Sequence, residues 1–312
     1  MKILVYHGSA DTYRALLAER FPDIEVVAGA TEELLDRHIE DAEVLLAWRV
    51  PLHVLKRARR LRWIQLTSAG IDHLVGAAGD IGGVVVTNAR GIHAALMADY
   101  TIGAVVMLQW NWMRLLRNQA ARAWQHQYTE PLAGKTLGVV GLGSIGAEIA
   151  RRGAAMGMRV LGMRRDPRPT AGVERMLGPA ELREMLAACD FVVLVVPGTA
   201  STRGMIGEGE LRSMRSSAFL INVARGSVVD EPALVRALEE GWIAGAALDV
   251  FAVEPLPATS RLWSMENVIV TPHVAGEPAE YARRAFEVFA RNVVRWRDGQ
   301  PLENVVDLAR GY

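Results

Sequence analysis

The sequence is poor in cysteine and has no excess of charge of either sign. Cys189 is the only cysteine among the 312 residues. It cannot form a disulfide within the chain, so a reducing, cytoplasmic location fits best. Because it lies just before an apolar run, we expect a buried structural thiol rather than a nucleophile. The 35 Lys and Arg residues balance the 35 Asp and Glu residues, so nothing suggests nucleic acid or an anionic membrane as a partner.

The sequence also lacks a long uninterrupted apolar run, an internal repeat and a low-complexity segment. Its most apolar stretch, residues 100–116, is interrupted by Gln109, Asn111 and Arg114. It is shorter than the ~18–20 apolar residues that a membrane span needs. The first six residues are too few for the apolar core of a signal peptide and predict a strand. The length exceeds what one hydrophobic core usually supports, so we expect two domains.

Residues 1–99 alternate short apolar runs with patterns of helical spacing. This alternation predicts an α/β domain in which helices cover both faces of a parallel sheet. The expected strands are 2–6, 24–27, 44–47, 63–66 and 84–87, and the expected helices are 12–20, 32–39 and 52–58.

A glycine-rich turn follows a short apolar run at residues 135–140. Gly141, Gly143 and Gly146 have the spacing G-x-G-x-x-G, and a helical pattern follows at once. Gly141 permits a tight turn, Gly143 lets the backbone approach a pyrophosphate, and Gly146 lets the helix pack closely on the strand. The phosphates would bind at the N-terminus of that helix. The context therefore predicts a dinucleotide site.

After this turn, apolar runs typical of strands again alternate with helical patterns, which predicts a doubly wound, Rossmann-type nucleotide-binding sheet. A helical pattern at 280–297 then leads to a tail at 301–312, and this final segment would return to the first domain. We therefore predict a dinucleotide-binding domain at 100–283 and a smaller, flavodoxin-like substrate domain at 1–99 and 284–312. The expected later strands are 159–163, 191–196, 218–223, 243–248 and 268–271.

A single helix is expected near residues 100–119, and it is too apolar to stand alone. Core packing between domains and a subunit interface explain it equally well, since Trp and Met side chains are enriched at interfaces. We expect a homodimer.

Three side chains that could take part in catalysis follow predicted strands at their carboxyl ends, where ligands bind in open α/β sheets. They are Arg225, Glu254 and His273. A dehydrogenase acting on a 2-hydroxy acid needs a cation for the substrate carboxylate and carbonyl, which an arginine fork supplies. It also needs a proton donor, for which histidine is suited, and a carboxylate to orient that donor. No two histidines have metal-ligand spacing, so we expect no catalytic metal.

The segments around these residues resemble those of the D-isomer-specific 2-hydroxyacid dehydrogenases, and the resemblance covers nearly the whole chain. The matching segments are 67–74, the glycine turn, 222–230, 247–256 and 271–276. The resemblance implies Arg225 as the substrate-binding arginine, His273 as the acid/base and Glu254 as its partner. It also implies that the backbone of Ala69 and Gly70 binds the substrate carboxylate, with Asp249 near the nicotinamide carboxamide.

The residues after the strand at 159–163 bear on the choice of cofactor. An Asp or Glu directly after this strand would bind the ribose hydroxyls of NAD, and that position holds Arg164, followed by Arg165. Two arginines would attract the 2′-phosphate of NADP(H), which we predict as the cofactor. A strand that ended two residues later would put Asp166 there and favour NAD. The expected cofactor contacts are Gly141, Gly143, Ser144, Ile145, Gly146, Arg164, Arg165, Pro197, Thr202, Val223, Ala224, Asp249 and Gly276.

Trp48 follows a strand of the first domain, in a segment that resembles the corresponding loop of glyoxylate/hydroxypyruvate reductases. These commonly use NADPH, so we predict a reductase of small 2-oxo acids with Trp48 in the substrate site; core packing of Trp48 is equally open. The second hypothesis is a co-repressor-like protein that binds dinucleotide without turnover. Such proteins carry long terminal extensions that this sequence lacks.

Overall fold

The computed structural model describes residues 1–74 and 81–308; the end of the expected tail, 309–312, lies outside these ranges. The chain divides into two compact units, Met1–Ile92 with Pro278–Tyr312, and His93–Glu277. The expected divisions, at 99 and 284, fall inside the helices α4 (Ala94–Gln109) and α10 (Tyr281–Arg297). Each helix is continuous, so the divisions lie just before the helices.

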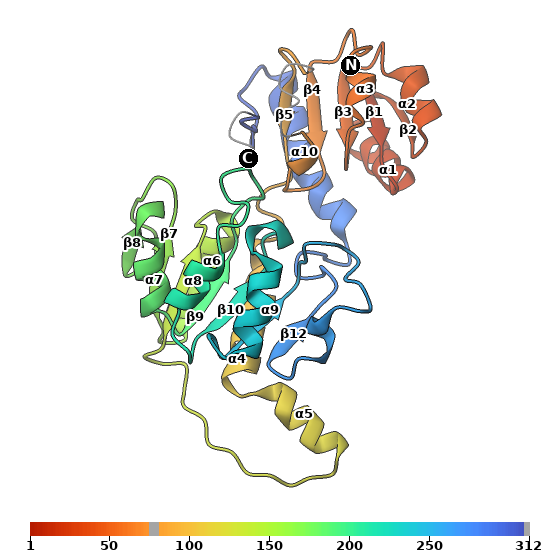
Figure 1. Ribbon diagram of the computed structural model, residues 1–312. Coiled ribbons are helices and arrows are strands. Elements are labelled where there is room, and N and C mark those ends of the chain that lie inside the picture. The colour runs from red at the N-terminus through yellow and green to blue at the C-terminus, as the bar shows by residue number, and fades with distance from the viewer. Residues whose placement is uncertain (75–80, 309–312) are drawn as a thin grey trace. The chain divides into compact units, whose positions relative to one another are not determined.

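Unit 1 is a five-stranded parallel sheet in the order β2-β1-β3-β4-β5, the flavodoxin-like order. Its helices cover both faces (Figure 1): α1 and α10 supply Tyr13 and Phe289 to one core, and α2 and α3 supply Leu35 and Val54 to the other. The elements are β1 (Lys2–Tyr6), α1 (Ala10–Arg20), β2 (Glu25–Gly29), α2 (Glu32–His38), β3 (Val44–Ala47), α3 (Leu52–Leu55), β4 (Trp63–Leu66) and β5 (Val85–Thr87).

Unit 2 is a seven-stranded parallel sheet in the order β12-β11-β10-β9-β6-β7-β8. The chain reverses its direction of travel between β6 and β9, which is the crevice where doubly wound sheets bind ligands. The helices α4 and α6 pack on one face, and α7, α8 and α9 pack on the other. The elements are β6 (Thr136–Val140), α6 (Ser144–Ala155), β7 (Arg159–Met163), β8 (Arg175–Leu177), α7 (Leu182–Ala188), β9 (Phe191–Leu194), α8 (Glu208–Ser213), β10 (Phe219–Asn222), α9 (Glu231–Glu239), β11 (Gly245–Leu248) and β12 (Val268–Val270).

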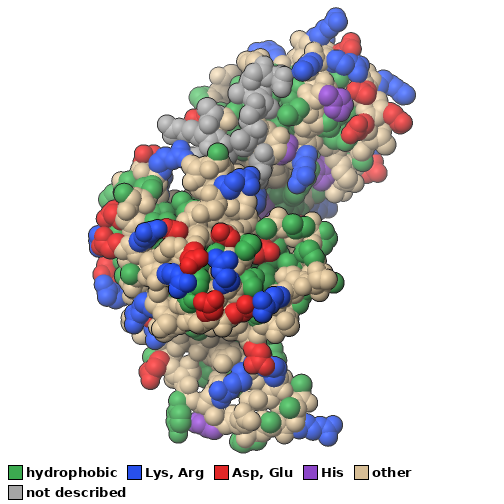
Figure 2. All heavy atoms as spheres, viewed as in Figure 1, with side chains coloured by type: hydrophobic (Ala, Val, Ile, Leu, Met, Phe, Trp, Pro, Cys, Tyr) green, Lys and Arg blue, Asp and Glu red, His purple; other side chains and the backbone are tan. Residues whose placement is uncertain are grey.

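The α/β fold with two parallel sheets is confirmed. Cys189 is fully buried in the core of unit 2, and burial raises the pKa of its thiol to about 12. None of the helices among the described residues is long and apolar enough to cross a membrane. Figure 2 shows acidic and basic side chains interspersed on the viewed face, as the balanced composition leads one to expect.

The single helix expected near 100–119 was wrong, because the structure has two helices there. Asn111 lies between α4 and α5 (Trp112–Ala120) in the left-handed region, with φ of 47°, and its side chain accepts a hydrogen bond from Arg114 N at 3.4 Å. Asparagine tolerates this conformation better than most residues and also caps the new helix. The helix α4 buries Val105 and Leu108 against the core, whereas α5 has no buried residue and extends away from the sheet (Figure 1).

Candidate active site

Three neighbouring strands of unit 2 carry the predicted catalytic residues at their carboxyl ends. Arg225 follows β10, Glu254 follows β11 and His273 follows β12. Because β10, β11 and β12 are adjacent and parallel, the loops after them leave the sheet at the same edge. The sheet therefore gathers three sequence-distant side chains in one region of unit 2.

His273 and Glu254 form a hydrogen-bonded pair. The imidazole Nδ1 lies 2.8 Å from Glu254 Oε2, while Glu254 Oε1 accepts a hydrogen bond from Phe251 N at 3.0 Å. An ionised carboxylate can only accept, so Nδ1 carries the hydrogen and Nε2 is the ring nitrogen left to exchange a proton with a substrate. His273 itself has φ of 55°, a backbone conformation that is sparsely populated outside glycine and clusters at functional sites.

The turn that carries His273 is held by a buried carboxylate. Asp249, 2% exposed, accepts hydrogen bonds at Oδ1 from Thr271 Oγ1 (2.6 Å) and Val274 N (2.9 Å), and at Oδ2 from Ala275 N (3.0 Å). His273 N also donates to the Asp249 carbonyl at 2.9 Å. Both carboxylate oxygens are thus bound by residues on either side of His273. Sequence reasoning missed this role, because the partners lie more than twenty residues away.

Arg225 lies in a turn whose backbone is fixed from two sides. Asn222 accepts a hydrogen bond from Ala224 N at 3.0 Å and donates one to the Arg225 carbonyl at 3.2 Å. The next residue is Gly226, where a Cβ atom would overlap the Phe251 carbonyl group. The glycine therefore permits the Arg225 turn to contact the loop that carries Glu254. A glycine directly after the arginine is a signal that sequence reasoning could have used.

A buried histidine, His93, lies near Arg225, although no sequence motif marks it as a site residue. His93 is 7% exposed, and burial, followed by the positive charge of Arg225, lowers the pKa of its imidazole to about 4. A neutral imidazole therefore lies beside the arginine near neutral pH. A Cβ atom added at Gly276 would lie 3.6 Å from the His93 ring, which is ordinary van der Waals contact.

The glycine turn after β6 has the geometry that a bound pyrophosphate requires. Gly141 has φ of 109°, and a Cβ atom at Gly146 would overlap the Gly141 carbonyl oxygen. Gly143 faces open space and precedes the first turn of α6, where no side chain caps the helix. The free N–H groups of that turn are available to an anion. The turn therefore fits the phosphates of a dinucleotide.

The other expected cofactor residues lie around the same sheet edge. The strand β7 ends at Met163, so Arg164 follows it directly, and Arg164 N still donates to Leu177 O of β8 at 3.2 Å. In the loop after β9, Thr202 Oγ1 donates to Pro197 O at 2.6 Å. Val223 and Ala224, directly after β10, are almost entirely buried, at 3% and 4% exposed.

In unit 1, the residues expected to bind substrate lie at the carboxyl ends of β3 and β4. Ala69 and Gly70 belong to the loop after β4, where Asn88 Nδ2 donates to Ala69 O at 2.8 Å. Trp48 follows β3 directly and is 38% exposed. Its ring meets Tyr281 edge to face, with centroids 5.2 Å apart. Tyr281, which also donates to Thr67 O at 3.0 Å, had no signal in the sequence.

The glycine turn and the acid–base side chains at the carboxyl edge of a doubly wound sheet define a dinucleotide-dependent α/β oxidoreductase. Residues 102–275 match the family model "D-isomer specific 2-hydroxyacid dehydrogenase, NAD binding domain". The chain belongs to the D-isomer-specific 2-hydroxyacid dehydrogenase family. This membership confirms the resemblance and supports the oxidoreductase hypothesis, not the co-repressor-like alternative.

Individual relatives agree with this assignment. A glyoxylate reductase from Thermococcus gammatolerans is 36% identical, over 96% of this chain and 93% of that protein. A D-3-phosphoglycerate dehydrogenase from Methanocaldococcus jannaschii is 33% identical over 94% of this chain, which spans only 57% of that longer protein. The structure of an NADPH-dependent glyoxylate/hydroxypyruvate reductase from Sinorhizobium meliloti, in complex with NADP and sulfate, superposes with a TM-score of 0.90. It is 29% identical, and the match covers 100% of this chain and 99% of that one.

Proposed function

We propose that the protein reduces a small 2-oxo acid to the 2-hydroxy acid with NADPH. The observation that carries the proposal is the His273–Glu254 pair, with 2.8 Å between Nδ1 and Oε2. Asp249 fixes the backbone of the turn that carries His273. An oriented histidine with one ring nitrogen available is what protonation of a nascent alkoxide requires.

Each protein group has one part in the proposed reaction. Arg225 binds the carboxylate and carbonyl oxygens of the substrate through its planar fork, and the amides of Ala69 and Gly70 bind the carboxylate. NADPH, when bound, supplies the hydride to C2 of the substrate. His273 donates a proton from Nε2 to the C2 oxygen, and Glu254 holds the imidazole and stabilises its charged form before the transfer.

We infer a preference for NADPH from the end of β7. Because this strand ends at Met163, as predicted, Arg164 and not Asp166 occupies the position directly after it. A guanidinium there, with Arg165 beside it, attracts a 2′-phosphate and gives no acceptor for the ribose hydroxyls of NADH. The NADP complex of the reductase from S. meliloti supports the same choice.

Steady-state kinetics test both parts of this proposal. Glyoxylate, hydroxypyruvate, pyruvate and phenylpyruvate are each assayed with NADPH and with NADH. We expect turnover of at least the smaller acids, since Trp48 lies beside the loops expected to bind substrate, and a higher kcat/KM with NADPH. No turnover across the panel would contradict the reductase, and a higher kcat/KM with NADH would contradict the cofactor choice alone.

We propose that the protein is a homodimer that pairs through α5 and the following segment, residues 121–131. Trp124 and Tyr128 are 101% and 94% exposed, and Trp112 and Leu116 of α5 are 43% and 45% exposed. Several large aromatic and aliphatic side chains left exposed along one segment are typical of an interface. Light scattering after size exclusion should give a dimer, and the double variant Trp124→Ala, Tyr128→Ala a monomer. Trp263→Ala, which removes an exposed tryptophan elsewhere, should stay dimeric; a monomeric wild type would contradict the proposal.

A further inference from the structure

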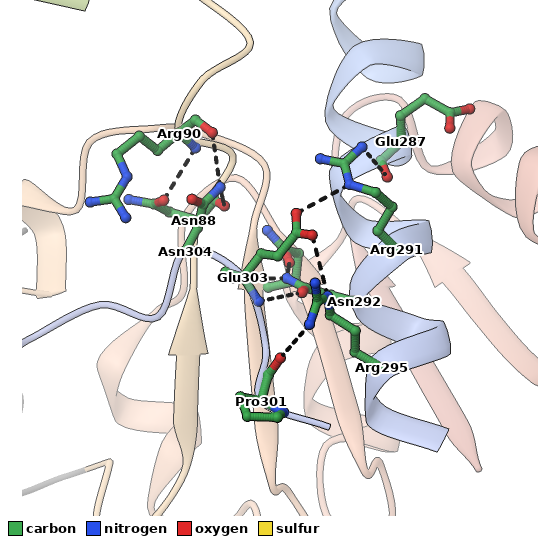
Figure 3. Close-up of polar contacts among 10 residues, drawn as sticks. Asn88, Arg90, Glu287, Arg291, Asn292, Arg295, Pro301, Glu303 and Asn304 are labelled. Carbon is green, nitrogen blue, oxygen red and sulfur yellow. Dashed lines mark hydrogen bonds and ion pairs between the residues drawn. The ribbon is translucent and has the colours of Figure 1, made fainter. Parts of the chain in front are cut away.

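The C-terminal segment of unit 1 is fixed by a buried asparagine and a cluster of ion pairs. Asn292 of α10 is fully buried, accepts a hydrogen bond from Glu303 N at 2.7 Å and donates to Glu303 O at 3.1 Å. The Glu303 carboxylate meets Arg291 Nε at 3.1 Å and Arg295 Nε at 3.2 Å (Figure 3). These contacts fix the position of Glu303, and therefore of the next residue, relative to the helix.

The same segment lies along the edge strand β5. An antiparallel bridge joins Thr87 and Val305, and Asn88 N donates to Asn304 O at 3.2 Å. The segment thus covers an edge that would otherwise expose unpaired backbone groups. It also places the Asn304 side chain directly beside the residues that follow β5.

The Asn304 side chain begins a chain of hydrogen bonds that ends at the loop after β4. Asn304 Nδ2 donates to Arg90 O at 2.8 Å and to Asn88 O at 3.3 Å. Arg90 N donates to Asn88 Oδ1 at 3.2 Å, and Asn88 Nδ2 donates to Ala69 O at 2.8 Å. Figure 3 shows Asn304 against Asn88 and Arg90. A residue more than two hundred positions away is therefore linked to the Ala69 peptide.

The chemistry of the Asn88 amide makes this chain directional. The Arg90 N–H group requires an oxygen, so the Asn88 amide must turn its NH₂ group toward the Ala69 carbonyl. Asn88 is 3% exposed, so water is poorly placed to replace either partner. By holding the Arg90 and Asn88 carbonyls, Asn304 fixes the backbone on which this orientation depends.

We propose that Asn304 and Asn88 are positioning residues for the substrate carboxylate, acting through the Ala69–Gly70 peptide. This inference rests on the proposed function, in which those amides bind the 2-oxo acid. A loop held in its binding conformation loses less entropy when the ligand binds, so the chain of hydrogen bonds increases substrate affinity without touching the substrate.

The test compares Asn304→Gly with Glu303→Gln. Asn304 has φ of 57°, which glycine adopts without strain, so Asn304→Gly removes the two donated hydrogen bonds and keeps the backbone. The loss of these bonds should raise KM for the 2-oxo acid about three- to tenfold. The turnover number kcat and KM for NADPH should change less than about twofold, because the lost hydrogen bonds act on the loop expected to bind the substrate carboxylate. Glu303→Gln weakens the ion pairs but leaves Asn304 in place, and should leave KM unchanged.

Two further measurements separate this inference from a purely structural role. Asn304→Asp keeps the shape but directs an acceptor at two carbonyl oxygens, so KM should rise more than in Asn304→Gly. A segment that only stabilised the fold would lower the active fraction, and so kcat, in all three variants with KM unchanged; that result would overturn the proposal.

Amide exchange of residues 68–71 tests the same link without turnover. Exchange should be faster in Asn304→Gly than in Glu303→Gln or the wild type. Equal exchange in all three would overturn the positioning role even if the wild type is a fully active reductase. An inactive wild type would instead contradict the proposed function, and faster exchange in Asn304→Gly would still support the link from Asn304 to the loop.

Discussion

The buried carboxylate of Asp249 gives the sharpest prediction for unit 2, because an isosteric substitution changes its chemistry and almost nothing else. In Asp249→Asn, the amide oxygen can keep the hydrogen bonds from Thr271 and Val274 at the Oδ1 position. The NH₂ group must then face Ala275 N, which donates to Oδ2 in the wild type. Two donors point at each other in a site that is 2% exposed.

The size of this effect follows from the hydrogen bonds involved. One hydrogen bond to a charged group is lost, which costs about 1.5–3 kcal/mol, and a buried donor is left unsatisfied, which costs about 1–3 kcal/mol. Asp249→Asn should therefore lower the free energy of unfolding by roughly 2.5–6 kcal/mol. That is a large part of the ~5–15 kcal/mol of a typical domain. Because the turn carries His273, kcat should also fall about 10- to 100-fold.

Denaturant unfolding and steady-state kinetics measure these two effects. The matched control is Asp230→Asn, which changes the same functional groups at the exposed N-cap of α9, where the side chain accepts from Ala233 N. Asparagine caps helices about as well as aspartate, so this control should stay within about 0.5 kcal/mol of the wild type. If Asp249→Asn matched the control in both stability and kcat, the carboxylate would not be what holds the turn.

Three further predictions concern other parts of the molecule. His273→Ala should lower kcat by ~10²–10⁴-fold while NADPH binding, measured by fluorescence titration, is kept; near-normal turnover would remove His273 from the chemistry. Replacing both Arg164 and Arg165 by alanine should raise KM for NADPH at least tenfold, because a charge-assisted hydrogen bond to the 2′-phosphate is lost. KM for NADH should change little, and an equal rise in KM for both cofactors would contradict a 2′-phosphate contact. Burial holds the pKa of His93 at about 4, below its unfolded value of 6.5, so the stability it contributes is complete above pH 6.5 and is lost as the pH falls toward 4, by about 2–3 kcal/mol. Unfolding measured from pH 7 to 4 should show this loss in the wild type and a smaller one in His93→Gln, and equal slopes would contradict it.

The sequence predicts the strands well and the irregular elements poorly. Residues 2–6, 44–47, 63–66 and 159–163 are strands in the structure with the predicted bounds. Strands buried on both faces read as short apolar runs between turn residues, so their signal is local. The strand β8 is the outermost strand of its sheet, has three residues and contains no apolar run of this kind. The break at Asn111 depends on one left-handed residue inside an apolar stretch, which periodicity does not reveal.

For the site, the sequence predicts which side chains lie at the carboxyl ends of the strands but not what holds them there. The placement of Arg225 and His273 follows from a general property of parallel sheets and needs no long-range contact. The bonds of Asp249 to residues 271–275, and the contact of Tyr281 with Thr67 O, join residues far apart in the chain. No spacing or periodicity encodes such pairs, so only the folded structure reveals them.

The two carboxylates near His273, those of Asp249 and Glu254, differ in their burial and in their hydrogen-bond partners. Asp249 is buried, and donors from the 271–275 turn occupy both of its oxygens. These hydrogen bonds fix the backbone of the turn that carries His273. Glu254 is 36% exposed, with one oxygen on Phe251 N and the other on the imidazole Nδ1. Of these two carboxylates, Glu254 is the one hydrogen-bonded to the ring, so in the proposed reaction it stabilises the imidazolium and keeps Nε2 directed for proton transfer. Of the two acids, Glu254 therefore orients the ring of the proposed proton donor, His273, and Asp249 fixes the backbone turn that carries it.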